Sequence, residues 1–209
     1  MKYNIQAINP VESRVLADPQ FQIALDLGKV RKGHLEGQLG YHIENILQYI
    51  EANFKSDRDY EKLRIIGIIH DMGKLGELVD NINKYMPSNA KNSKFYLEAS
   101  QNFIKEIGKQ PDKGYVPAHA MYSYEFAKKH TIDKQVLEVI KFHDTAFRLS
   151  KLEKTLPYKI YKKIGIHIKK VFASLDNELM LKFMEVDNSG RDTEIVTWLK
   201  TKLQKEKII

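Results

Sequence analysis

Histidine and aspartate side chains recur along the chain in a pattern that suits a metal site. A single histidine in a helix is more often a core or surface residue than a ligand, so no member of the set is decisive by itself. The adjacent pair His70-Asp71 is more informative, because it closes the most apolar predicted helix. A charged aspartate there is costly unless it is paired or binds a metal; the alternative is a helix-terminal pair exposed at the domain edge. The candidates are His42, His70, Asp71, His119, His143 and Asp187.

Any metal must be bound through nitrogen and oxygen, because the chain contains no cysteine. Imidazole and carboxylate ligands together suit divalent transition metals. The two oxygens of Asp71 could also bridge two metals. Disulfides, thiolate metal sites and cysteine nucleophiles are excluded.

The elements that must position these residues are predicted to be helices. Apolar residues recur at helical spacing in most of the chain, and residues 65–69 form a run that is apolar on nearly all sides. That β-branched run could be a buried strand, but its length and flanks favour a helix. We therefore predict an all-α fold.

Caps and turns mark the predicted helix boundaries. Asp18-Pro19, Asp59 and Asp133 are expected to begin helices. Gly73, Gly76 and Gly108 are expected to end them. Residues 175–205 are predicted to form two helices around a turn at residues 188–190.

Composition and charge describe an ordinary globular protein with a basic surface. The 209 residues suit one domain, or one domain with a small elaboration, and 43% of them are hydrophobic. No apolar run approaches the ~20 residues that cross a bilayer, and the first residues lack a signal-peptide core. We therefore expect a soluble, cytoplasmic protein with no membrane partner.

The net charge of +7 attracts anions. Seven lysines lie in one segment, which is either an anion-binding surface or a solvated helix face: Lys151, Lys154, Lys159, Lys162, Lys163, Lys169 and Lys170.

The residues around His70-Asp71 resemble the signature of a known family. An apolar helix, His-Asp, a small hydrophobic residue and Gly-Lys mark the HD-domain superfamily of metal-dependent phosphohydrolases, and residues 67–74 are similar to this signature. Met72 stands where many relatives have isoleucine, which is a volume-conserving exchange. Further segments resemble the other ligand elements of the family in the same order, over roughly residues 35–205: 39–47 around His42, 116–120 around His119, 139–144 around His143 and 183–188 around Asp187.

The resemblance implies a fold and a set of ligands. Residues 35–209 would form a single-domain helical bundle of the HD-domain type, and residues 1–34 an N-terminal helical extension. Members with two additional histidines hold two divalent metal ions, and the sequence does not distinguish Mn, Fe, Ni, Co, Zn and Mg. The first metal would be bound by His42, His70, Asp71 and Asp187, and the second by His119 and His143 with Asp71 bridging.

Basic residues near the ligands are candidates for substrate binding. Lys74 lies three residues beyond Asp71, and the resemblance includes this lysine. Arg148 and Arg191 present planar guanidinium groups that suit phosphate. Each of the three could instead be a surface charge or a structural ion-pair partner.

The resemblance implies hydrolysis of a phosphate ester. Two metals ~3.5–4 Å apart would bind the phosphoryl group and activate a water, with Asp71 and Lys74 as catalytic residues. The chain is most similar to the HD domains attached to transfer-RNA nucleotidyltransferases and their stand-alone relatives, through the spacing of Phe183, Asp187, Gly190 and Arg191. That similarity implies a nucleotide-like phosphomonoester or phosphodiester as substrate, such as a 2′,3′-cyclic phosphate or a 2′-nucleotide.

Two other functions remain as alternatives. Some HD proteins with six ligands resemble di-iron oxygenases, and histidine and aspartate suit iron as well. A nucleic-acid or nucleotide binding module would also explain the positive charge, although it has no use for six ligands. Nucleic acid is therefore a second candidate partner, and the sequence makes no prediction of oligomeric state.

Overall fold

All regular secondary structure in the described part of the chain is helical, as the sequence predicts. The computed structural model describes residues 2–30, 35–88, 90–155, 158–191 and 193–209, and only the backbone of residues 158–163. The helices of the first half are α1 (Pro10–Ala17), α2 (Pro19–Ala24), α3 (Leu39–Asn53), α4 (Tyr60–Ile69), α5 (Lys74–Glu77), α6 (Ile82–Tyr85) and α7 (Ser93–Ile107). Those of the second half are α8 (Ala118–Ala127), α9 (Lys134–Phe142), α10 (Thr145–Thr155), α11 (Tyr158–Phe172), α12 (Asn177–Asp187) and α13 (Thr193–Lys205).

Helix α4 lies at the centre of the bundle. It packs against α1, α3, α9 and α12, which explains why residues 65–69 are apolar on nearly every side and buried. Gly67 allows α3 to approach closely, because a Cβ atom there would lie 2.6 Å from Cγ2 of Ile46. The first candidate ligands, on α3 and just after α4, are therefore held by a tightly packed helix pair.

A second helix pair, α8 and α9, carries the next ligands. The two helices pack against each other, and α9 also packs against α4. Asp133 begins α9 as predicted, since its Oδ1 accepts hydrogen bonds from the backbone N–H groups of Gln135 (2.9 Å) and Val136 (3.2 Å). The two pairs thus meet along α4 and α9.

The N-terminal helices share the core of the rest of the chain. Val15 of α1 and Phe21 of α2 are fully buried in the same apolar cluster as the residues of α4. Arg64 of α4 also forms a buried ion pair with Glu12 of α1, with Nη2 3.0 Å from Oε2. Removing one member of such a pair leaves an uncompensated buried charge, so α1 is tied firmly to the centre of the bundle.

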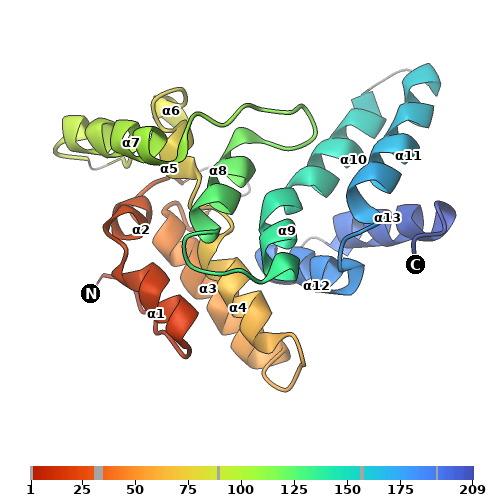
Figure 1. Ribbon diagram of the computed structural model, residues 1–209, viewed down its shortest axis with the longest axis horizontal. Coiled ribbons are helices and arrows are strands. Elements are labelled where there is room, and N and C mark those ends of the chain that lie inside the picture. Colours follow the sequence, from red (N-terminus) through yellow and green to blue (C-terminus); the bar gives the residue numbers. More distant parts are fainter. Residues whose placement is uncertain (1, 31–34, 89, 156–157, 192) are drawn as a thin grey trace.

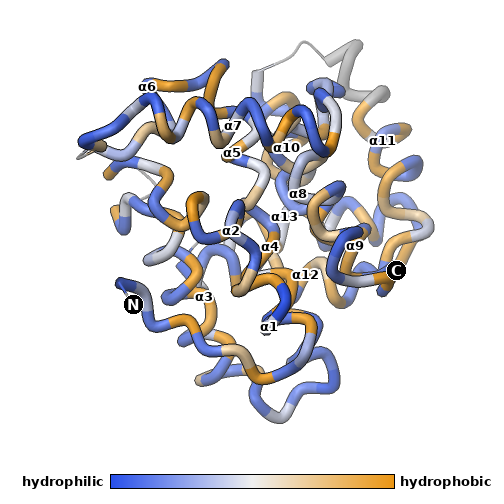
Figure 2. Tube along the Cα trace, turned by 60° about the vertical axis from the view of Figure 1, so that its left-hand side comes forward, coloured by the Kyte–Doolittle hydropathy of each residue, from blue (hydrophilic) through white to orange (hydrophobic). Residues whose placement is uncertain are grey.

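The C-terminal helices form the other end of the molecule. Figure 1 shows α1 and α2 at one end and α10, α11 and α13 at the other, and α13 packs against α10, α11 and α12. The predicted turn between the last two helices is present, with positive φ at Ser189 (48°) and Gly190 (69°). Hydrophilic and hydrophobic residues follow one another in short alternating runs along most helices (Figure 2), which is typical of helices with one face in a core.

Some caps differ from the expectation. Asp18 caps α2 and Gly108 ends α7 as predicted. Asp59 precedes α4, but its side chain makes no capping hydrogen bond and instead accepts one from Nζ of Lys182 at 2.9 Å. Helix α4 ends at Ile69, before Gly73 and Gly76. Neither glycine has a positive φ; both lie under α8, where a Cβ would collide with its residues.

No helix within the described ranges has both the length and the apolar character needed to cross a bilayer.

Candidate metal centre

Four buried histidines converge from four helices. His42 lies in the first turn of α3 and His119 in the first turn of α8, whereas His70 directly follows α4 and His143 directly follows α9. The ring centroid of His70 lies 5.4 Å from that of His42 and 5.2 Å from that of His143. His119 completes the row, 5.4 Å from His143. Residues more than 100 positions apart thus form one cluster.

Two aspartates divide these histidines into two groups that could each hold a metal ion. The first group is His42, His70 and Asp187, and the second is Asp71, His119 and His143; within each, the ligand atoms lie within 4.8 Å of one another.

Distances in the first group are short. Oδ1 of Asp187 lies 3.1 Å from Nε2 of His42 and 3.3 Å from Nε2 of His70. The prediction that residues 183–188 bring an aspartate to His42 and His70 therefore agrees with the geometry.

Asp71 lies between the two groups. Its Oδ1 is 3.8 Å from Nε2 of both His119 and His143, and its Oδ2 is 3.5 Å from Nε2 of His70. One carboxylate thus faces three imidazoles, which is the placement that a bridging ligand requires. The structure brings together all six residues proposed as ligands.

The outer nitrogen of each histidine has an acceptor. Nδ1 of His70 donates to the backbone carbonyl of Gly67 (3.0 Å), and Nδ1 of His143 donates to that of Ile140 (2.8 Å). Because a carbonyl can only accept, both rings carry a proton on Nδ1 and turn Nε2 inward, where that nitrogen can bind a metal or hold a second proton.

Carboxylates hold the other two rings. Nδ1 of His42 lies 3.2 Å from Oε1 of Glu36, and Nδ1 of His119 lies 3.8 Å from Oε2 of Glu77. Metal-binding histidines commonly donate the second ring nitrogen to a carboxylate or carbonyl. Three rings follow this pattern at hydrogen-bond distance, and Glu77 faces the outer nitrogen of His119 from further away, so each Nε2 is oriented toward the aspartates.

An unsatisfied nitrogen supports a metal at this position. Nε2 of His70 is buried and has no hydrogen-bond partner in the described part of the chain. Oδ1 of Asp187 and Oδ2 of Asp71 lie 3.3 and 3.5 Å away, so this nitrogen faces two negatively charged groups. A divalent cation would satisfy it, and the set of imidazoles and carboxylates suits such a cation.

The cluster carries strong electrostatic coupling. Burial alone would raise the pKa of Asp71, but Lys74 and His70 outweigh burial and hold that pKa well below its usual value. Burial likewise opposes protonation of His70, yet the charges of Asp71 and Asp187 raise its pKa to about 10. Burial lowers the pKa of His143. Two ionised carboxylates therefore attract positive charge, which is a proton on His70 when no metal is bound.

A cavity of about 350 Å³ opens beside both groups. It is lined by all the proposed ligands except His70, and by residues of α5, α6 and α10, of the turn after α12 and of the link between α9 and α10. We call it the metal-centre cavity, and its further lining residues are Lys74, Lys84, Tyr85, Asp144, Phe147, Asn188 and Arg191.

The three proposed substrate contacts differ in position. Lys74 lines the cavity and its Nζ donates to Oδ2 of Asp71. Arg191 also lines the cavity and is exposed at its rim. Arg148 does not line it: its Nη1 donates to Oδ1 and Oδ2 of Asp112, both at 2.8 Å, and to the carbonyl of Gly114 at 2.9 Å. Of the two roles considered for Arg148, the structure therefore supports an ion pair.

Several residues of the centre were not predicted. Glu77 accepts hydrogen bonds from the backbone N–H of His119 (2.9 Å) and from the hydroxyl of Tyr85 (3.0 Å). Burial would raise the pKa of Glu77, but its bonds to His119 and Tyr85 lower it to about 2. Neither Glu36 nor Glu77 has a telling sequence spacing. Asp144 did have a signal, because it follows His143 as Asp71 follows His70; its Oδ2 lies 3.5 Å from Nε2 of His119.

Comparison of the chain with models of known protein families, with curated proteins and with solved structures finds no match.

Proposed function

We propose that the protein is a metal-dependent phosphohydrolase of the HD-domain type, with two divalent ions bound by the first and second groups. The observation that carries this proposal is the pair of complete His-His-Asp groups beside one cavity, with Asp71 facing both. Bound there, two metals would act as Lewis acids and lower the pKa of a bound water.

The chain contributes positive charge around the phosphoryl group. Nζ of Lys74 is fixed by Asp71 at the cavity wall, where its ammonium can donate to a phosphate oxygen. Arg191 at the rim presents a planar guanidinium, which suits two phosphate oxygens at once. These cations favour an anionic substrate and so favour a phosphohydrolase over an oxygenase.

Asp144 supplies a carboxylate outside the six ligands. Its side chain is 33% exposed, lines the cavity and lies against His119. A carboxylate in this position can accept a proton from a water or hold a substrate hydroxyl. The cavity volume of about 350 Å³ lies within the range of small-molecule sites, and a nucleotide or similar phosphate ester is the substrate class that we propose.

Replacing the shared aspartate tests the proposal. We expect Asp71→Asn to lower metal-dependent hydrolysis of p-nitrophenyl phosphate and bis(p-nitrophenyl) phosphate by more than about 100-fold. Loss of a residue that only hydrogen-bonds to a ligand can already cost about that much, and Asp71 is proposed as a ligand itself. Metal content, measured by plasma emission spectrometry, should fall as well.

Asp112→Asn is the matched control, because Asp112 is exposed and pairs with Arg148 away from the cavity. It should keep wild-type turnover. Wild-type turnover in Asp71→Asn would rule out the proposed centre. Tightly bound iron with no hydrolysis by the wild-type protein would instead favour an oxygenase.

A further inference from the structure

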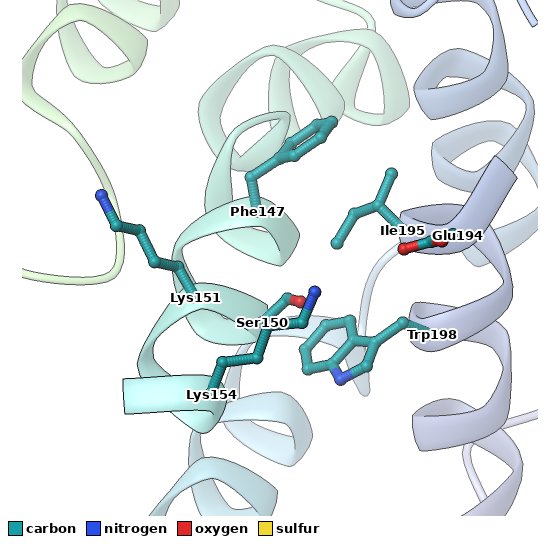
Figure 3. Close-up of a pocket in the computed structure, with 7 residues that line it drawn as sticks. All are labelled: Phe147, Ser150, Lys151, Lys154, Glu194, Ile195 and Trp198. Carbon is teal, nitrogen blue, oxygen red and sulfur yellow. The ribbon is translucent and has the colours of Figure 1, made fainter. Parts of the chain in front are cut away.

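A second cavity of about 540 Å³ adjoins the metal-centre cavity. It lies between α10 and α13, and Figure 3 shows side chains of both helices around it. Phe147 lines both cavities. We call the second cavity the aromatic groove, and its lining residues are Phe147, Ser150, Lys151, Lys154, Glu194, Ile195 and Trp198.

The apolar part of the groove is a fixed aromatic surface. Trp198 projects from α13 toward α10, with Phe147 and Ile195 further along the groove (Figure 3). The indole N–H of Trp198 donates to Oε2 of Glu153 at 2.5 Å, and Glu153 also pairs with Lys202. The ring is therefore held in one orientation while part of its surface stays accessible. A partly exposed, immobilised tryptophan is suited to stacking against a planar ring.

The polar part of the groove is mainly cationic. Lys154 points across the groove beside Trp198, whereas Lys151 points outward from α10 (Figure 3). Neither lysine pairs with a carboxylate among the described residues. The side chains of Lys159, Lys162 and Lys163, which belong to the same predicted basic segment, lie outside the described residues. Two lysines outnumber the one carboxylate among the lining residues, that of Glu194, and lysines beside an aromatic ring fit a ligand that carries both phosphate and planar bases.

The groove lies next to the metal centre along the chain as well as in space. Helix α12 ends at the proposed ligand Asp187, and Arg191 of the following turn lines the metal-centre cavity. Helix α13 then begins at Thr193 and carries Trp198. A substrate with its phosphate at the metal centre can therefore extend past Phe147 along α13.

We propose that the aromatic groove binds the nucleotides next to the scissile phosphate of a single-stranded oligonucleotide. Bases stack on Trp198 and Phe147, and phosphates contact Lys151 and Lys154. This assignment rests on the proposed phosphohydrolase function and narrows its substrate from nucleotide-like esters to a single-stranded nucleic acid. A free mononucleotide would fill the metal-centre cavity and leave the groove empty.

Intrinsic fluorescence gives a direct test, because Trp198 is the only tryptophan in the chain. Titration of the metal-free protein with an oligouridylate of about ten nucleotides, within the usual span of single-strand sites, should quench the emission. The affinity should fall as salt increases, since phosphate contacts release counterions. Uridine monophosphate should quench weakly or not at all. Equal affinity for the mononucleotide, or no quenching by the oligonucleotide, would overturn the proposal.

Variants assign the binding to the groove. With a fluorescein-labelled oligonucleotide, Trp198→Ala should weaken binding by about 5- to 150-fold, the range for loss of one stacked base. Trp198→Phe should recover part of the affinity, and Lys154→Glu, at an exposed position, should weaken binding without loss of folding. Lys128→Ala is the matched control, because Lys128 is an exposed lysine that pairs with Glu125 on α8. Unchanged affinity in both Trp198→Ala and Lys154→Glu would overturn the proposal.

Hydrolysis of a small ester separates this proposal from the one on which it rests. In the metal-loaded protein, the groove variants should raise KM for the oligonucleotide and leave turnover of bis(p-nitrophenyl) phosphate unchanged. Turnover of the small ester without oligonucleotide binding would contradict the role proposed for the groove but not the phosphohydrolase function. Absence of turnover with either substrate would contradict the phosphohydrolase itself, whatever binds in the groove.

Discussion

The four proposed histidine ligands differ in the group that holds the outer nitrogen. Backbone carbonyls fix His70 and His143, whereas carboxylates hold His42 and His119. Each group therefore contains one histidine of each kind. The carbonyls fix a tautomer, and the carboxylates add negative charge behind the ring, which increases its basicity as a ligand.

Protonation of His70 leads to a prediction about metal binding. Its pKa of about 10 lies above the ordinary value of 6.5, so at pH 8 the metal-free protein carries a proton there that a metal must displace. We expect release of about one proton or more per chain at pH 8, and an affinity that increases with pH up to about 10. Calorimetric titration with Zn²⁺ in two buffers of different ionisation enthalpy measures the number of protons.

The raised pKa of His70 also makes the stability of the metal-free protein decrease as the pH increases, whereas the metal affinity increases. In the metal-free protein, protonated His70 stabilises the fold fully below pH 6.5, and this contribution is lost as the pH increases through about 10. A histidine with an ordinary pKa would release almost no proton at pH 8. Absence of proton release there would therefore show that the carboxylates do not hold a proton on His70.

At the residue scale, the sequence allowed prediction of the residues that converge but not of those that orient them. The six candidate ligands stood out through His70-Asp71 and the ordered segments around the other four. Glu36 lies on a turn and Glu77 ends the short helix α5, and only the packing of α5 beneath α8 brings Glu77 to His119. For Arg148 the sequence allowed either a phosphate contact or an ion pair, and it could not reveal that Asp112 binds the guanidinium group.

At the element scale, two helix pairs supply equivalent residues. In α3–α4 and in α8–α9, the first helix carries a histidine in its first turn, and the second ends at an adjacent His-Asp pair. This equivalence is not evident from the sequence, because the core residues of the two pairs differ. The helices themselves were predictable from apolar periodicity and caps, whereas their mutual contacts depend on long-range packing.

Gly73 is the point at which the two pairs are joined most closely. A Cβ atom there would lie 1.9 Å from the carbonyl oxygen of His119 and 2.6 Å from the backbone nitrogen of Ser123. Gly73 also donates its backbone N–H to Oγ of Ser123 at 2.8 Å. We expect Gly73→Ala to lower the free energy of unfolding by about 3 kcal/mol or more, the upper end for overpacking, as measured by urea denaturation.

Gly165→Ala serves as the control for this substitution. Gly165 lies within α11, and a Cβ there would meet only the flexible carboxylate of Glu206, at 2.8 Å. Its change in stability should stay within about 1 kcal/mol, because alanine favours a helix. Equal stability of the two alanine variants would contradict the close packing described at Gly73.

At the scale of the whole molecule, one core supports both ends of the bundle. The resemblance divided the chain at residue 34, but Val15 and Phe21 are buried with residues of α4 and α12. Composition could not reveal this, since an apolar residue carries no information about its partners. The net charge of +7 was informative in a general way, but only the fold brings Lys154 beside Trp198 and the groove beside the metal centre.

Metal titration with turnover as the readout tests most directly whether the two groups form one dinuclear phosphohydrolase centre. Mn²⁺ would be added stepwise to the metal-free protein while hydrolysis of bis(p-nitrophenyl) phosphate is recorded. We expect the rate to increase until about two ions are bound per chain and then to stay constant, because both ions act on one phosphoryl group. Full activity with one ion would contradict the dinuclear centre, and absence of hydrolysis at every ratio would contradict the proposed function.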